Sequence, residues 1–256
     1  MDILTAILLG IIQGVTEWLP ISSSGHLALA QILMDQEPPI FFDVMLHFGT
    51  LCAVLLYFRD DALRLLKGLF KGPEQERQTV LMLIIAMVPV LMVGFLLEEQ
   101  IEDTFRSTKA VAVGLLITTA ILFPTMKFYG GKGKLEDYKP KSALVVGLAQ
   151  ALSILPGVSR SGSTIATGMY QDFDREAAAR FSFLLSIPTI MGVVIYELIK
   201  LAAGEVQMDV PTIAGTITAF TVGYLAISTL LKVIQKKGFH YFAIYTLALG
   251  LFFLVY

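Results

Sequence analysis

Six apolar runs, each long enough to cross a lipid bilayer, constrain most strongly what this chain can fold into. They lie near 39–58, 77–97, 107–127, 176–200, 210–231 and 240–256, and a transmembrane helix needs about 20 consecutive apolar residues. Of the 256 residues, 55% are hydrophobic and only 16% are charged, whereas soluble domains carry about 25% charged residues. A single soluble core cannot bury that surplus, so we expect an all-α integral membrane protein.

The net charge limits the classes of partner that we expect, and the cysteine count limits which disulfides the chain can form. A net charge of −2 argues against a nucleic-acid partner. The single cysteine, Cys52, allows no disulfide within the chain and is expected to be a small buried hydrophobe. Asp2 is the only charge before Glu17. The N-terminus therefore lacks the basic region of a signal peptide, and we expect it to belong to the mature protein.

Two further apolar segments are interrupted rather than continuous. Residues 3–19 run into Pro20 and a group of serines, and residues 143–155 run into Pro156 and a second group of serines. A short, moderately apolar piece follows each break, at 24–33 and 163–171. We expect two re-entrant helix hairpins, because broken backbone at membrane depth is tolerated only where protein or a wet cavity surrounds it.

The chain contains an internal repeat with an offset of 137 residues. The matched positions are Gly10, Gln13 and Gly25 in the first copy and Gly147, Gln150 and Gly162 in the second. We expect one membrane domain over 1–256, with a first repeat over 1–130 and a second over 140–256. Each half then holds one hairpin and three spans. An odd number of crossings places the halves in opposite orientations, which is an inverted-topology repeat with six transmembrane helices in all.

The distribution of basic residues predicts the orientation in the membrane. Loops 59–77, 127–141 and 232–240 share one side and hold five, five and three Lys or Arg, whereas 98–109 and 200–209 hold two and one. The positive-inside rule makes the first side cytoplasmic. We therefore expect both termini and the mouth of the first hairpin to face the outside, and the second hairpin to enter from the cytoplasm.

The first break carries a carboxylate, three serines and a histidine. Gln13 and Glu17 are four residues apart and share a helix face. Glu17 ends an apolar helix, and an ionisable group at membrane depth indicates a functional site. Ser22, Ser23 or Ser24 can cap the next helix, whose N-terminus is a ready anion site.

His26 follows Ser23 by three residues, so the two side chains are expected to face one cavity if Ser23 begins the helix. A hydroxyl, an imidazole and the carboxylate of Glu17 are together the parts of an activated nucleophile. The alternative is a capped kink in which Glu17 and His26 pair for structural reasons.

The second break carries an arginine among serines. Arg160 is the only basic residue between Lys141 and Arg175. A guanidinium fixed at a helix N-terminus suits a phosphate group. The alternatives are an arginine that snorkels to the interface or one that pairs with Glu17.

An inverted repeat brings the two breaks together near the bilayer midplane. The result is a polyanion pocket reached through lipid, and a lipid diphosphate is the ligand class that fits it best. A weaker expectation concerns Asp43 and His47, which share a face of one span, with Arg180 at the repeat position of Asp43. An Asp43–Arg180 ion pair would tie the two halves together structurally.

At these residues the sequence resembles the undecaprenyl-diphosphate phosphatases of the bacitracin-resistance type. The resemblance rests on two long motifs and extends over essentially the whole chain: Gln13-Gly14-Val15-Thr16-Glu17-Trp18-Leu19-Pro20 with Ser22-Ser23-Ser24-Gly25-His26, and Pro156-Gly157-Val158-Ser159-Arg160-Ser161-Gly162. It implies an enzyme of the bacterial plasma membrane that hydrolyses undecaprenyl diphosphate to undecaprenyl phosphate and phosphate. That reaction recycles the carrier lipid for cell-wall synthesis.

The resemblance also implies roles for individual residues. It places Glu17, Ser23, His26 and Arg160 at the catalytic positions of the family. We expect the other polar and glycine residues of the breaks to bind the diphosphate, namely Gln13, Ser22, Ser24, Gly25, Ser159, Ser161, Gly162 and Ser163. Many family members carry Glu where this chain has Gln13, so here that side chain is expected to orient water or bind a phosphate oxygen.

The working hypothesis is that Ser23 or a water molecule attacks the terminal phosphorus on the outer side of the membrane. His26 is a general acid and base or the nucleophile itself, and Glu17 orients His26 or holds a divalent cation, Mg²⁺ or Ca²⁺. Expected partners are the lipid substrate and the bilayer, with a homodimer left open. The alternatives are a lipid flippase or secondary transporter on the same repeat, and a purely structural subunit, which leaves Arg160 unexplained.

Overall fold

The computed structural model describes residues 1–70, 72–96, 107–128, 131–235 and 238–256. Within these ranges the chain is helical, and the one β-type contact is an isolated bridge between Gly133 and Phe173. The expected all-α class is confirmed for this part of the chain. The helices are α1 Ile3–Thr16, α2 Ser23–Leu33, α3 Ile40–Tyr57, α4 Arg59–Phe70, α5 Glu74–Leu96, α7 Thr108–Leu122, η1 Phe123–Lys127, η2 Leu135–Asp137, α8 Pro140–Leu152, α9 Arg160–Tyr170, α10 Arg175–Ala202, α11 Val210–Gln235 and α12 Tyr241–Val255.

Five helical segments of the described residues are long and apolar enough to cross a membrane. They are Ile40–Tyr57, Glu74–Gly94, Thr108–Lys127, Arg175–Ala202 and Val210–Val233. The sixth expected span corresponds to α12, which has 15 residues and is shorter than a standard crossing. The chain is therefore a multi-pass membrane protein, and the count of six spans stays a prediction.

Large apolar side chains are exposed on all five of these helices. Leu91, Ile199 and Val210, for example, are 54%, 63% and 64% exposed. Soluble monomers rarely expose extensive apolar surface. Lipid is the solvent in which this surface is stable, in agreement with the composition.

Both expected helix–break–helix segments are present, and the local chemistry explains where each break falls. Pro20 follows α1, and Ser22 caps α2 by accepting a hydrogen bond of 3.2 Å from the Gly25 amide. Ser159 caps α9 in the same way, accepting a bond of 3.1 Å from the Gly162 amide. Helices α2 and α9 have 11 residues each and begin at positions that the sequence repeat relates.

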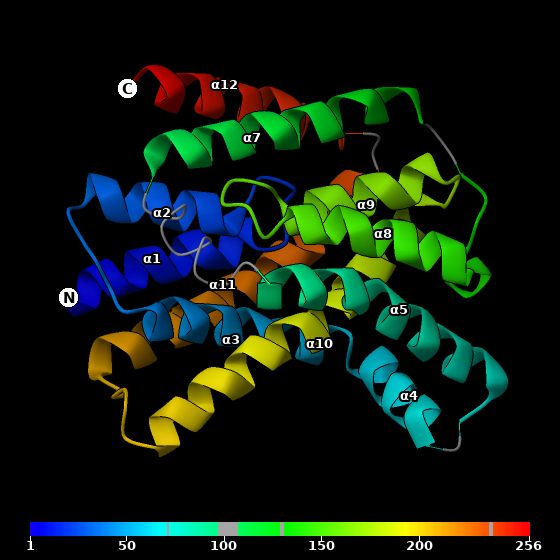
Figure 1. Ribbon diagram of the computed structural model, residues 1–256, viewed down its shortest axis with the longest axis horizontal. Helices are drawn as coiled ribbons and strands as arrows, with labels where there is room; N and C mark the ends of the chain where they lie inside the picture. The colour runs from blue at the N-terminus through cyan, green and yellow to red at the C-terminus, as the bar shows by residue number, and fades with distance from the viewer. Residues whose placement is uncertain (71, 97–106, 129–130, 236–237) are drawn as a thin grey trace.

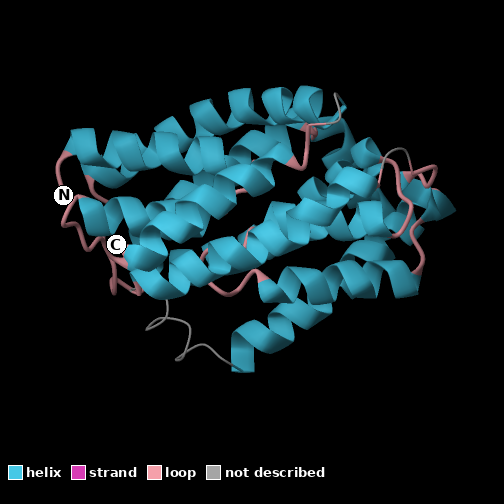
Figure 2. Cartoon of the chain, turned by 90° about the horizontal axis from the view of Figure 1, so that it is seen from above, coloured by secondary structure: helices cyan, strands magenta, loops and turns pink. Residues whose placement is uncertain are grey.

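The helices of the two halves pack crosswise. α1 packs against α11, α8 packs against α5, α7 lies against α12, and α3 contacts α10 and α11. Figure 1 shows α7 and α12 side by side at the edge of the molecule, and both views place the two termini at the same end (Figures 1 and 2). The first helix of each broken pair, α1 or α8, is therefore held by a helix from the opposite half.

One helix replaces a segment that we expected to be a loop. Residues 59–70 form α4, which carries Asp60 and Asp61 in its first turn and Lys67 in its last. Those charges complement the helix dipole at both ends, a local signal that the loop assignment of 59–77 overlooked. In Figure 1, α4 lies at the end of the molecule away from the termini.

Candidate active site

Glu17 is the centre of the polar cluster at the first break. It follows the last residue of α1, where its amide still donates to the Gln13 carbonyl over 2.9 Å. Its Oε2 atom accepts hydrogen bonds from Ser23 Oγ at 2.6 Å and from Gln13 Nε2 at 3.0 Å. The side chain is only 6% exposed, so these donors replace the water that a buried carboxylate loses.

Arg160 brings the second break to the same carboxylate. One of its terminal nitrogens donates to Glu17 Oε1 over 2.6 Å, and the other donates to the Ser182 carbonyl over 3.3 Å. The guanidinium carbon lies 5.7 Å from the centre of the Trp18 ring, and the ring makes an edge contact with Phe183. The Glu17–Arg160 pair that we set beside phosphate binding as an alternative is thus present.

The two breaks touch through backbone and small side chains. Ser161 Oγ donates to the Leu19 carbonyl over 3.0 Å. A Cβ atom on Gly25 would lie 3.0 Å from Gly157 Cα, and one on Gly162 would lie 3.3 Å from Pro20 Cβ. The glycines therefore permit a close approach of the breaks that larger residues would prevent.

The serines of the two breaks are mostly bound within the protein. Ser22 and Ser24 lie 3.3 Å apart through their hydroxyl oxygens, and Ser159 and Ser161 repeat that arrangement at 3.3 Å. Ser163 is 1% exposed, and its hydroxyl has no hydrogen-bond partner among the described residues. Of the hydroxyls predicted to contact substrate, Ser23 is the one joined directly to the Glu17–Arg160 pair.

His26 does not join this cluster. Its Nδ1 atom lies 2.7 Å from the Ser22 carbonyl, and its Nε2 atom lies 2.7 Å from the Tyr245 hydroxyl of α12. The imidazole stacks on the Tyr245 ring with 5.6 Å between centroids. The expected alternative of a Glu17–His26 pair is therefore not formed, and both ring nitrogens face groups other than Ser23.

A different histidine faces Glu17. His47 of α3 places Nε2 at 3.6 Å from Glu17 Oε2. The spacing of His47 and Asp43 predicts a shared helix face, but neither residue was predicted to belong to the site. The one available signal was a second imidazole at membrane depth in an apolar span, and only the packing of α3 against α1 reveals its neighbour.

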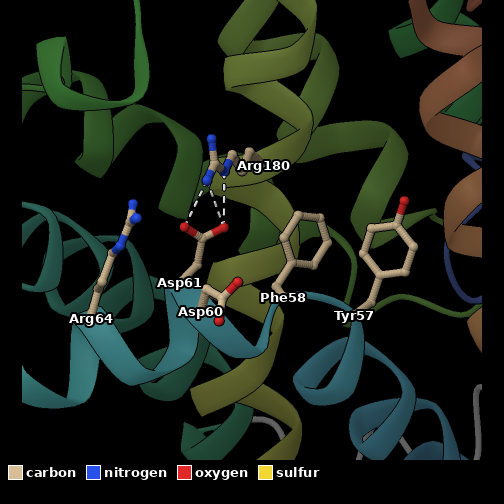
Figure 3. Close-up of a pocket in the computed structure, with 6 residues that line it drawn as sticks. All are labelled: Tyr57, Phe58, Asp60, Asp61, Arg64 and Arg180. Atoms are coloured by element: carbon tan, nitrogen blue, oxygen red, sulfur yellow. Dashed lines mark hydrogen bonds and ion pairs between the residues drawn. The ribbon is translucent and has the colours of Figure 1, made fainter.

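The expected Asp43–Arg180 ion pair is wrong. Asp43 accepts a hydrogen bond of 2.7 Å from Gln31 of α2. Arg180 instead holds Asp61 of α4 with two guanidinium nitrogens, at 2.7 and 3.0 Å (Figure 3). Asp61 lies in the first turn of α4, where a loop was expected. Its carboxylate has the geometry that suits a planar guanidinium. An ion pair does join the two halves, but its acid is Asp61 and not Asp43.

The described residues offer no protein cage for a metal ion. No group of three or more His, Cys, Asp or Glu side chains is close enough to hold a metal within the described ranges. Among the described residues of the cluster, Glu17 is the one carboxylate, and Arg160, Ser23 and Gln13 bond its two oxygens. The expected divalent cation stays a prediction.

The fold and site define an all-helical membrane protein in which two broken helices join a serine, a carboxylate and an arginine in a buried cluster. The chain belongs to the family described as bacitracin resistance protein BacA, whose model matches residues 6–252. It is 41% identical over 261 residues to the undecaprenyl-diphosphatase of Korarchaeum cryptofilum, with 98% of each chain covered. It is 40% identical over 265 residues to the undecaprenyl-diphosphatase of Desulfosudis oleivorans, with 98% of this chain and 97% of the relative covered.

Proposed function

We propose that this protein is an undecaprenyl-diphosphate phosphatase. It hydrolyses the lipid diphosphate to undecaprenyl phosphate and inorganic phosphate, and so recycles the carrier lipid for cell-wall synthesis. The family membership and the names of relatives at about 40% identity support the activity. The observation that carries the assignment to a site is the hydrogen bond of 2.6 Å from Ser23 to Glu17, next to Arg160.

In this proposal Ser23 is the nucleophile, and its hydroxyl gives up its proton to the carboxylate that already accepts it. Arg160 has five N–H donors, so it can hold Glu17 and still reach a phosphate oxygen. The capped N-termini of α2 and α9 supply further positive potential where the two breaks meet. Phosphoryl transfer depends mainly on positioning and charge neutralisation, which these groups provide. His26 and the remaining residues of both breaks border the diphosphate.

The membrane arrangement is part of the same proposal. The halves are related by inverted topology, the site opens to the outside of the plasma membrane, and both termini lie outside. The matched positions of α2 and α9, the crosswise packing and the basic loops support this arrangement. Any divalent cation enters with the diphosphate rather than as a resident cofactor, and a homodimer is compatible with the site because every residue named in it comes from one chain.

The deciding experiment measures phosphate released from a prenyl diphosphate by the purified protein in detergent, with and without a chelator. We expect release by the wild type and a loss of at least about 100-fold in Ser23→Ala and Arg160→Ala. Ser228→Ala is the control, because within the described part of the chain that hydroxyl bonds the Leu225 carbonyl of its own helix and no other group. Wild-type rates in both site variants would overturn the assignment. No release by the wild type, together with movement of labelled lipid across sealed vesicles, would favour a flippase.

A further inference from the structure

We propose that His47 is an imidazole that exchanges the proton of the reaction, acting through Glu17 as a positioning and relay residue. The inference rests on the phosphatase activity proposed above. The chain has three histidines. Only one of them lies within ion-pair distance of the carboxylate that holds the Ser23 hydroxyl.

The hydrogen bonds of His47 fix which nitrogen is available. Its Nδ1 atom lies 2.8 Å from the Asp43 carbonyl. A carbonyl oxygen only accepts, so Nδ1 carries a proton and donates it. The other nitrogen, Nε2, is then an acceptor in the neutral ring and a donor in the charged one. This variable nitrogen is the one that points at Glu17 Oε2.

The same two nitrogens are already used in His26. Nδ1 donates to the Ser22 carbonyl, so in the neutral ring Nε2 accepts from the Tyr245 hydroxyl, each over 2.7 Å. Exchange of a proton with Ser23 would require His26 to give up a short hydrogen bond and a stacked tyrosine. His47 needs no such rearrangement, and its side chain is 28% exposed against 6% for Glu17. The imidazole is thus more exposed than the carboxylate that it faces.

The helix that carries His47 is held at the site from two sides. A Cβ atom on Gly49 would lie 2.3 Å from the Thr216 carbonyl oxygen, so α3 is seated closely on α11. Thr50 donates to the His47 carbonyl over 2.9 Å and lies 3.5 Å from Gln13 Nε2. Asp43, whose carbonyl orients the imidazole, is held through its side chain by Gln31 of α2. These contacts link the imidazole to both helices of the first hairpin.

Ser23 Oγ, Glu17 Oε2 and His47 Nε2 thus lie in sequence, at 2.6 and 3.6 Å. The second distance exceeds a hydrogen bond, and a closure of about half an ångström brings the pair into range. Gln13 on the same carboxylate oxygen and Arg160 on the other hold Glu17 in place while the imidazole closes.

The proton balance follows from this order. As the Ser23 Oγ–phosphorus bond forms, the bridging phosphorus–oxygen bond breaks, and its electron pair leaves on undecaprenyl phosphate. The Ser23 proton passes to Glu17 and then to His47 Nε2. Water then attacks the phosphoserine: its oxygen bonds phosphorus, the Ser23 oxygen leaves, and one water proton restores the hydroxyl. The second water proton stays on the inorganic phosphate. His47 releases its proton to solvent, so the net products are lipid monophosphate, hydrogen phosphate and one proton.

The test compares three substitutions at His47 in full-length protein in detergent. His47→Asn keeps a donor near Nδ1 and removes Nε2, whereas His47→Gln keeps a polar atom near Nε2 that cannot exchange protons. We expect both, and His47→Ala, to lower kcat by about 100-fold with KM changed less than threefold. Added imidazole should restore phosphate release in His47→Ala, which a purely structural role would not allow. His240→Ala is the control, since His240 contacts Tyr241 at the start of α12.

The outcomes separate this inference from the proposed function. A wild type that releases no phosphate contradicts the phosphatase assignment itself. A wild type that is active, with His47→Ala at the same kcat, contradicts the role of His47 alone. Full activity in His47→Gln also overturns it, because hydrogen bonding to Glu17 would then suffice. The thermal midpoint of each variant shows whether it folds. If His47→Ala does not fold, the rescue by imidazole is measured in folded His47→Asn instead, and that result decides.

Discussion

At the scale of the residue, the polar cluster between the two breaks is organised by one buried carboxylate. Glu17 and Arg160 are 6% and 14% exposed at their side chains. Removing one partner of a buried pair leaves an uncompensated charge, at a cost of about 3 kcal/mol or more. We therefore expect Arg160→Met to lower the thermal midpoint in detergent markedly. Glu17→Gln added to that variant should recover most of the loss, because no charge is then left alone.

Arg59 and Asp60 provide the control for this prediction. Their charged atoms lie 3.9 Å apart, with side chains 72% and 81% exposed. An exposed pair contributes little to stability. The single variant Arg59→Met and the double variant Arg59→Met/Asp60→Asn should therefore both keep the thermal midpoint of the wild type. If the double variant at Glu17 and Arg160 is as unstable as Arg160→Met alone, the lone buried charge is not the cause.

The same residues show how far the sequence could predict the site. Spacing placed Glu17 and Gln13 on one face, and the repeat brought Arg160 to them, because both are local or symmetric properties. The choice between two histidines was not predictable in this way. His26 is four residues after Ser22, so its ring bonds back to the Ser22 carbonyl of the same turn. His47 reaches Glu17 from another helix, and only tertiary packing determines that neighbour.

At the scale of the element, the breaks were predictable because proline, serine and glycine act locally. The close approach of the two breaks was not predictable from the sequence, and it depends on Gly157. This residue has φ +86°, and a Cβ atom there would lie 2.2 Å from the Val111 carbonyl oxygen. Its own carbonyl accepts a hydrogen bond of 2.9 Å from Thr118 of α7. We expect Gly157→Ala to push the second break away from α7 and lower phosphate release by about 100-fold, together with the thermal midpoint.

Gly204 separates the two causes of this effect. It has φ +78°, but no atom lies within 4 Å of a Cβ placed there. Gly204→Ala therefore meets only the backbone penalty of about 1 kcal/mol and should keep full activity. Equal losses of activity in the two variants would show that backbone conformation alone, and not the seating of the break on α7, explains the result at Gly157.

At the scale of the whole molecule, the halves are joined by the Asp61–Arg180 pair as well as by crosswise packing (Figure 3). Arg180 is 39% exposed at its side chain and Asp61 14%, so solvent weakens the pair to about 1 kcal/mol. We expect Asp61→Ala to lower the thermal midpoint by a few degrees. Asp60→Ala is the matched control, since both acids lie in the first turn of α4. Equal shifts would assign the effect to the helix dipole instead.

The orientation of the whole molecule rests on its charges, because basic loops stay on the cytoplasmic side. Residues 59–77, which include helix α4, hold five Lys or Arg, whereas residues 200–209 hold only one. Both Lys67 and Glu205 are exposed, so each can be replaced by cysteine in a Cys52→Ala background. We expect a membrane-impermeant thiol reagent to label Glu205→Cys in intact cells, and to label Lys67→Cys only after the membrane is opened. Phosphate release by both variants shows that the fold is retained. The reverse pattern of labelling would invert the topology and would place the mouth of the first hairpin, with Ser23, on the cytoplasmic side.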